Sequence, residues 1–178
     1  MMANSPAKSL VASYFKDLPT TLLAVFVLAG CTGKRHHLPD TFDAEEVAFL
    51  HKTGTATIQG QAFLKRDDGI VIYAAGEDVY LIPSGRYAQT RLDLIYRGRN
   101  RSHFRGSIEP DSPGYLKNMK VTIADSQGRF TFPRLSAGTY HLITTVVWEV
   151  DEISQGGPIH YKVSVNSGET KIVIMNGR

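Results

Sequence analysis

The chain has 178 residues, of which 42% are apolar and 21% are charged, a composition that is typical of one globular domain and excludes extended disorder. Its formal net charge of +3 gives no basis for nucleic acid as a partner, because nucleic-acid-binding domains usually carry a dense basic stripe. The single cysteine excludes an intramolecular disulfide and a thiolate-rich zinc site, since both need several cysteines.

Residues 1–30 predict a lipoprotein signal peptide. Two lysines precede an apolar run over residues 22–30 that is too short to span a bilayer. The run ends in Leu28-Ala29-Gly30-Cys31, which resembles the lipobox of bacterial lipoproteins. The resemblance implies cleavage before Cys31. A buried N-terminal helix with an inert core cysteine is the alternative, and Pro19 argues against it.

Lipidation places the protein in the cell envelope. The lipobox resemblance implies that the sulfur of Cys31 carries acyl chains, which anchor a protein to a membrane without a transmembrane helix. The next residue is Thr32, not Asp. By the sorting rule of Gram-negative bacteria, this favours the outer membrane, with the protein facing the periplasm.

Residues 31–52 predict a connection between the anchor and the domain. The segment up to Pro39 is polar and is expected to act as a tether. A short helix should follow it, capped by Asp40 or Thr41. The apolar side of this helix would pack on the domain and consists of Phe42, Val47, Phe49 and Leu50.

Residues 53–178 predict an all-β domain, because apolar and polar residues alternate there with a period of two. The expected strands are residues 53–65, 70–73, 79–82, 120–123, 129–132, 139–150, 159–165 and 170–175. Turn residues predict hairpins around 125–128 and 166–168 and a further turn at 156–158. The strand 139–150 is apolar on both faces, so we expect it in the middle of a sheet. Such a series indicates a two-layer antiparallel β-sandwich.

An insert at residues 86–106 interrupts the strands. Apolar residues at helical spacing predict a short amphipathic helix in it, followed by an arginine-rich loop. The insert holds six arginines and one acidic residue, so its local formal charge is +5. A basic patch that contains arginine, tyrosine and phenylalanine has the residue types of binding hot spots. The predicted partner-binding residues are Tyr96, Arg97, Arg99, Arg101, Phe104 and Arg105. A solvated loop without a partner is the competing interpretation.

Residues 125–140 carry two linked motifs. An acidic residue, Asp125, precedes Gly128-Arg129-Phe130, and Leu135 begins a Leu-x-x-Gly-x-Tyr corner that ends at Tyr140. Both motifs resemble the signature of the carboxypeptidase regulatory-like domain. The resemblance implies a transthyretin-like sandwich over residues 53–175 and a non-catalytic accessory role.

The residues of these motifs also have structural roles of their own. Gly128 should close a hairpin, and Phe130 and Phe132 should point to one side of the sheet. Gly138 should permit a sharp corner, and Tyr140 should bury its ring while its hydroxyl finds a backbone partner.

The alternative function is a metal-dependent enzyme of the intradiol dioxygenase type, which also has a sandwich core. Tyr140, His141 and Tyr161 could supply iron ligands, but the segment around His160 has only one of the two histidines of the expected His-x-His motif. Strand alternation also places Tyr140 and His141 on opposite faces. The chain contains no Gly-x-Ser-x-Gly motif and no phosphate-binding loop. We therefore predict no catalytic residue, no metal ligand and no cofactor.

These observations predict a non-catalytic envelope lipoprotein whose β-sandwich binds or scaffolds a partner. An envelope protein is one class of partner. An anionic envelope polymer is the other, because guanidinium groups form paired hydrogen bonds with anions.

Overall fold

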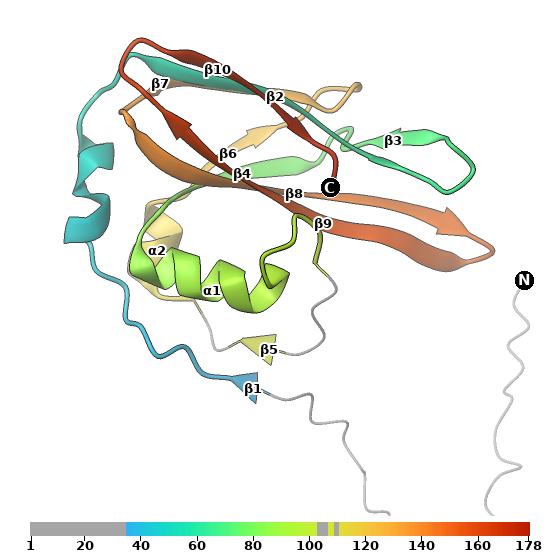
Figure 1. Ribbon diagram of the computed structural model, residues 1–178, viewed down its shortest axis with the longest axis horizontal. Coiled ribbons are helices and arrows are strands. Elements are labelled where there is room, and N and C mark those ends of the chain that lie inside the picture. The colour runs from blue at the N-terminus through green and yellow to red at the C-terminus, as the bar shows by residue number, and fades with distance from the viewer. Residues whose placement is uncertain (1–34, 103–106, 109–110) are drawn as a thin grey trace, which may run out of the picture. The chain divides into compact units, whose positions relative to one another are not determined.

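Two four-stranded β-sheets packed face to face form the body of the protein in the computed structural model (Figure 1). The described residues are 35–102, 107–108 and 111–178, and all belong to one compact unit. The predicted signal peptide and Cys31 lie outside these ranges. The predicted all-β sandwich is confirmed. Within the described residues, no helix is long and apolar enough to cross a bilayer.

Each sheet has four strands. The first sheet consists of β2 (Ala56–Lys65), β3 (Val71–Tyr73), β7 (Arg129–Leu135) and β10 (Thr170–Met175). The second sheet consists of β4 (Asp78–Pro83), β6 (Lys120–Ile123), β8 (Gly138–Val150) and β9 (Ile153–Val165). Strand β2 is the centre of the first sheet, and the order of the second is β6-β4-β8-β9. The position of β8 between two neighbours confirms that the strand apolar on both faces lies mid-sheet.

The core between the sheets follows the predicted alternation. Alternate residues of β2, beginning with Ala56 and Ile58, are buried, and so are Phe130 and Phe132, which lie on one side of β7 as predicted. Leu81, Leu142 and Ile159 are fully buried on the facing side of the second sheet. Burial of such side chains from both sheets is the main force that holds the layers together.

The hairpin predicted around residues 125–128 is wrong, although its turn is correct. The turn itself forms, since Gly128 has φ 70° and its N–H donates to the Asp125 carbonyl over 2.9 Å. The strands on either side then separate, because β6 pairs with β4 and β7 pairs with β2. The local turn chemistry is therefore correct, but the chain crosses from one sheet to the other.

The predicted hairpin around residues 166–168 is wrong for the same reason. Strand β9 pairs with β8, whereas β10 pairs with β2 in the other sheet and runs parallel to it. The turn predicted at 156–158 is also wrong, because these residues lie within β9. The turn is at Asp151 and Glu152, which both have left-handed backbone, with φ 49° and 63°.

The predicted insert forms a second layer on the second sheet. Its helix α1 (Arg86–Tyr96) confirms the helical periodicity. A short helix α2 (Pro113–Lys117) follows, so the insertion between the paired strands β4 and β6 is longer than predicted. Figure 1 shows both helices on the side of the second sheet that faces away from the first. A second apolar cluster forms there and contains Leu38, Ile82, Tyr87, Ala88 and Tyr115.

The N-terminal part of the described chain packs on the domain. A two-residue strand β1 (Arg35–His36) pairs in parallel with β5 (Ser107–Ile108) of the insert. Since Leu38 is buried, the predicted tether is packed at that point. The predicted short helix is a 3-10 helix, η1 (Glu45–His51), and Ala44 occupies its N-cap position. The predicted caps are therefore wrong: Asp40 accepts a hydrogen bond from Thr90 of α1 instead.

The Leu-x-x-Gly-x-Tyr corner joins η1 to the sandwich. The ring of Tyr140 is fully buried, and its hydroxyl donates to the Ser136 carbonyl over 2.8 Å, as predicted. Burial raises the pKa of Tyr140 to about 12. Gly138 has no left-handed φ, so glycine is not required at this corner for its backbone conformation. It is needed for space, because a Cβ atom there would lie 2.6 Å from the ring of Phe49.

We expect Gly138→Val to destabilise the protein by about 1–3 kcal/mol, because the added carbons would overlap the Phe49 ring. Urea unfolding should be measured for Gly138→Val in the parental protein and in a Phe49→Ala background. Removal of the ring should make the valine substitution less costly. An equal cost in both backgrounds would show that steric overlap with Phe49 is not the cause.

Candidate functional site

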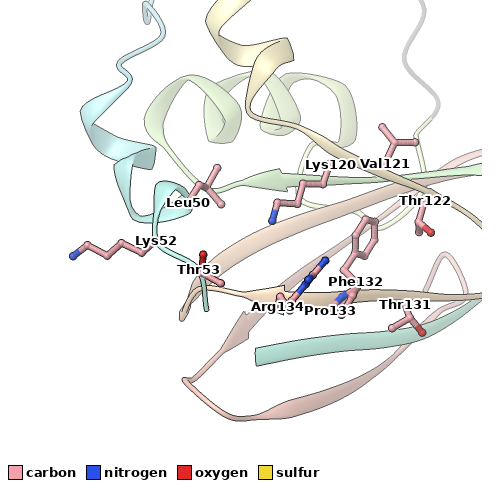
Figure 2. A pocket seen from close by; sticks show the side chains of 10 residues that line it. All are labelled: Leu50, Lys52, Thr53, Lys120, Val121, Thr122, Thr131, Phe132, Pro133 and Arg134. Carbon is pink, nitrogen blue, oxygen red and sulfur yellow. The ribbon is translucent and has the colours of Figure 1, made fainter. Parts of the chain in front are cut away.

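An open groove with a volume of about 670 Å³ lies where the two sheets separate at β6 and β7 (Figure 2). The groove is lined by three basic residues, three threonines and four apolar residues. These are Lys52, Lys120 and Arg134; Thr53, Thr122 and Thr131; and Leu50, Val121, Phe132 and Pro133. Strand β6 supplies one wall, β7 supplies the other, and the end of η1 with the residues after it closes one side.

The register of β6 turns a lysine towards the inside of the sandwich. Lys120 stands opposite Leu81 of β4, and Thr122 stands opposite Val79. Residues that face each other across an antiparallel pair lie on the same side of the sheet. Because Leu81 and Val79 are buried in the core, Lys120 and Thr122 also point inward. An edge strand therefore presents a cation to the space between the sheets.

A bulge in β7 supplies the opposing cation. Pro133 and Arg134 together occupy the place opposite a single residue of β2, Thr57, where the register of the pair shifts. Arg134 has left-handed backbone there, with φ 57°. Such bulges redirect a side chain. In Figure 2, Arg134 and Lys120 reach into the same space from opposite walls, whereas Lys52 extends away from it.

The groove has no anionic group to balance these cations. None of the described residues that line it is acidic. Within the part of the chain that the structure describes, Lys52, Lys120 and Arg134 form no ion pair. Two converging cations repel one another, so the groove favours a ligand that brings negative charge. The hydroxyls of Thr53 and Thr122 can donate to or accept from that ligand, and Leu50 provides a partly exposed apolar side chain.

The wall formed by η1 is fixed by contacts on both sides. The Ser136 hydroxyl donates to the Lys52 carbonyl, and the Phe49 ring packs edge-on against Tyr140 with 5.8 Å between ring centroids. Arg86 of α1 forms an ion pair with Glu46 of η1. Hydrogen bonds from the backbone and the side chain of Arg86 lower the pKa of the Glu46 carboxyl. A fixed wall reduces the entropy lost when a ligand binds.

The arginines of the insert serve different roles. Arg97 and Arg99 are exposed, and their predicted contact with a partner stays a prediction. Arg101 is partly buried, and its Nη2 donates to the Gly156 carbonyl over 3.0 Å, which fastens the insert to β9. Phe104 and Arg105 lie outside the described residues.

One predicted contact residue is not available at the surface. Tyr96 is only 4% exposed, and its ring packs on His160 with 4.8 Å between centroids. Its prediction as a surface anchor is wrong because the apolar side of α1 faces the sheet. The insert also uses Arg91 for structure, since Arg91 Nε lies 2.9 Å from a carboxylate oxygen of Asp111.

A histidine pair lies beneath α1, and the sequence alone did not indicate it. His141 Nδ1 and His160 Nε2 are 2.9 Å apart, and His141 Nε2 lies 3.2 Å from the Ser84 hydroxyl. His141 is 0% exposed. The pairing depends on the β8–β9 register, which follows from the turn at Asp151 and Glu152. A turn at 156–158 would give β8 and β9 a different register, so the sequence-based prediction did not place the two histidines next to each other.

The histidine pair is neutral at physiological pH. Burial lowers the pKa of both imidazoles to about 4, and for His141 the neighbouring His160 and Lys162 lower it further. Asp93 of α1 acts in the opposite direction on both. One nitrogen of the pair must donate and the other accept, which a neutral pair satisfies.

The iron ligand set considered from the sequence is divided between two faces. Tyr140 and Tyr161 lie on the core side of the second sheet, and His141 and His160 lie on the side that α1 covers. Among the described residues, no group of three or more histidine, cysteine, aspartate or glutamate side chains is arranged to hold a metal ion.

We expect stability to fall as the pH decreases from about 6.5 to about 4. The ordinary pKa of 6.5 applies to both histidines in the unfolded chain, which therefore binds protons in this range while the folded protein does not. Urea unfolding of the parent and of His160→Gln between pH 7 and pH 4.5 tests this. The variant keeps a hydrogen-bonding side chain but loses one titrating group, so its stability should depend less on pH. Identical pH profiles would contradict the assignment.

Comparison with known proteins identifies the fold and not a family. No family model matches the chain, and no curated protein sequence matches it. The resemblance to the carboxypeptidase regulatory-like domain therefore stays a prediction. A solved structure from Pseudomonas aeruginosa, described as a "putative carbohydrate binding protein", is similar with a TM-score of 0.65 and 22% sequence identity. The match covers 78% of this chain and 99% of that chain, and it shows the β-sandwich fold.

Proposed function

We propose that this protein is a non-catalytic lipoprotein of the cell envelope and that its β-sandwich binds an acidic polysaccharide in the groove between β6 and β7. The observation that carries the proposal is the convergence of Lys120 and Arg134 on a space whose described lining has no acidic residue. Of the two partner classes that the sequence predicts, an anionic polymer fits this site better than a protein does.

The shape and chemistry of the groove suit a saccharide that carries carboxylates. The groove is open along the edges of both sheets, so a polymer can enter and leave it without its ends passing through a closed cavity. Arg134 can form paired hydrogen bonds with a carboxylate, and Lys120 can act as a point charge. Thr122, which points inward, offers a hydroxyl to the hydroxyl groups of a sugar. The description of the similar solved structure as a "putative carbohydrate binding protein" supports the saccharide class.

We expect Lys120→Gln and Arg134→Asn each to weaken binding of polygalacturonate by about tenfold or more, because each removes a charge-assisted hydrogen bond. Asparagine is chosen at Arg134 because it tolerates left-handed backbone. Binding should be measured by isothermal titration calorimetry, with uncharged dextran as the comparison ligand. Parental binding should weaken as salt is raised.

Lys117→Gln is the matched control, since Lys117 is an exposed cation on α2 away from the groove lining. It should bind polygalacturonate like the parent.

An inward lysine can also protect an edge strand from pairing with another chain, so the oligomeric state of Lys120→Gln must be checked by gel filtration. Parental affinity in both groove variants, at parental melting temperature, would contradict the proposal. If Arg97→Ser with Arg99→Ser removed binding instead, the insert would be the binding surface.

The envelope location has its own test. We expect Cys31→Ser to prevent acylation, because serine lacks the sulfur that receives the lipid. Intact-mass analysis and membrane fractionation of the parent and the variant in a Gram-negative host measure this. The parent should carry acyl mass and fractionate with membranes. If the variant had the same acyl mass and the same fractionation, Cys31 would not be the anchor.

A further inference from the structure

The outer face of the first sheet is bare, in contrast to that of the second. Both helices lie on the second sheet, and no helix of the described chain covers the face formed by β3, β2, β7 and β10 (Figure 1). Large apolar side chains are exposed there, including Tyr73 at 41% and Ile174 at 46%. Soluble proteins rarely leave such side chains grouped on one surface without a binding role.

Strand register places five side chains of this face together, and we call them the outer-face patch. Gln61 of β2 stands between Arg129 of β7 and Ile174 of β10. Two residues further along β2, Phe63 stands opposite Tyr73 of β3, and their rings pack edge to face with 6.1 Å between centroids. Ala62 and Leu64, which alternate with Gln61 and Phe63 along β2, are buried in the core, so all five point outward.

Two polar side chains of the outer-face patch, Gln61 and Arg129, can interact with a ligand. The amide nitrogen of Gln61 donates to the Gln127 carbonyl over 2.9 Å, which fixes the side chain and leaves its carbonyl oxygen to accept from a hydroxyl. The guanidinium of Arg129 forms no ion pair with any residue that the structure describes. A fixed acceptor beside a cation and two aromatic rings suits a charged sugar, whose C–H face packs on a ring while its polar groups bond at the edge.

The patch is continuous with the groove along β7. Thr131 lines the groove and also stands opposite Gln59 on the outer face, two residues from Arg129. Arg129 and Arg134 thus place one cation near each end of β7. Their Cα atoms are about 16 Å apart at the usual rise of a β-strand. An acidic polymer that leaves the groove past Thr131 meets Arg129 and then the aromatic pair.

We propose that the outer-face patch is a second subsite for the polysaccharide bound in the groove, so that one chain occupies both and Tyr73 stacks on a sugar ring. This inference rests on the proposed function, because it takes the same ligand class. Charge complementarity with Arg129 and continuity through Thr131 favour the same acidic chain over an unrelated partner.

Affinity should therefore depend on the length of the ligand. We expect a galacturonate disaccharide, which fills only the groove, to bind Tyr73→Ser and Arg129→Gln like the parent. A galacturonate octasaccharide should bind the parent more tightly than the disaccharide does, and each variant should weaken that binding by about fivefold to tenfold. Calorimetric titration measures both ligands, and thermal melting confirms that the variants remain folded.

Tyr80→Ser is the matched control, since Tyr80 is a tyrosine of the other sheet with a similar exposure, 37%. It should change neither affinity. The inference is overturned if the octasaccharide and the disaccharide bind the parent equally, or if folded Tyr73→Ser and Arg129→Gln bind the octasaccharide like the parent. Loss of disaccharide binding in Lys120→Gln and Arg134→Asn would then still support the groove. Conversely, octasaccharide binding that needs Tyr73 but not Lys120 or Arg134 would overturn the proposed function and leave the outer-face patch as the site.

Discussion

The contact of Phe49 with Gly138 and Tyr140 joins the parts of this structure that matter for binding. Its ring packs on Tyr140 and occupies the space that a side chain at residue 138 would need. This contact holds η1 against the end of the sandwich, and the residues after η1 complete the groove wall. The buried tyrosine of the corner therefore stabilises more than its own strand. A small residue at 138 and a large one at 49 are required together, because dense packing leaves no room for both to be large.

The groove illustrates a conflict between stability and binding. Folding brings Lys120 and Arg134 towards the same space without an acidic partner among the described lining residues, which costs free energy in the absence of a ligand. Inward-facing Lys120 also blocks the edge of β6, so one side chain can serve both solubility and recognition. Because the cations come from opposite sheets, the groove depends on the stacking of the two layers and cannot form in either sheet alone.

The insert produces an asymmetry between the two sheets. Its helix covers the second sheet, where the histidine pair and Tyr96 form a partly polar layer beneath it. The same helix fixes η1 through the pairing of Arg86 with Glu46. Much of the charge of the insert is thereby used for structure, in Arg86, Arg91 and Arg101. The opposite sheet keeps an uncovered face of aromatic and amide side chains.

The sequence by itself determined the local features of this protein. The period-two pattern of β2, the helical spacing of α1, the left-handed Gly128 and the hydrogen bond from the Tyr140 hydroxyl to the Ser136 carbonyl all follow from interactions within a few residues, which composition and spacing reveal. Only the tertiary structure decided which strands pair. Both turns predicted as hairpins instead lead the chain from one sheet to the other, because a turn fixes the direction of the chain and not the partner of the next strand. The groove, the histidine pair and the outer-face patch combine residues far apart in sequence, so they depend on strand register. Register is set by burial across the whole sandwich, and no local pattern contains that information.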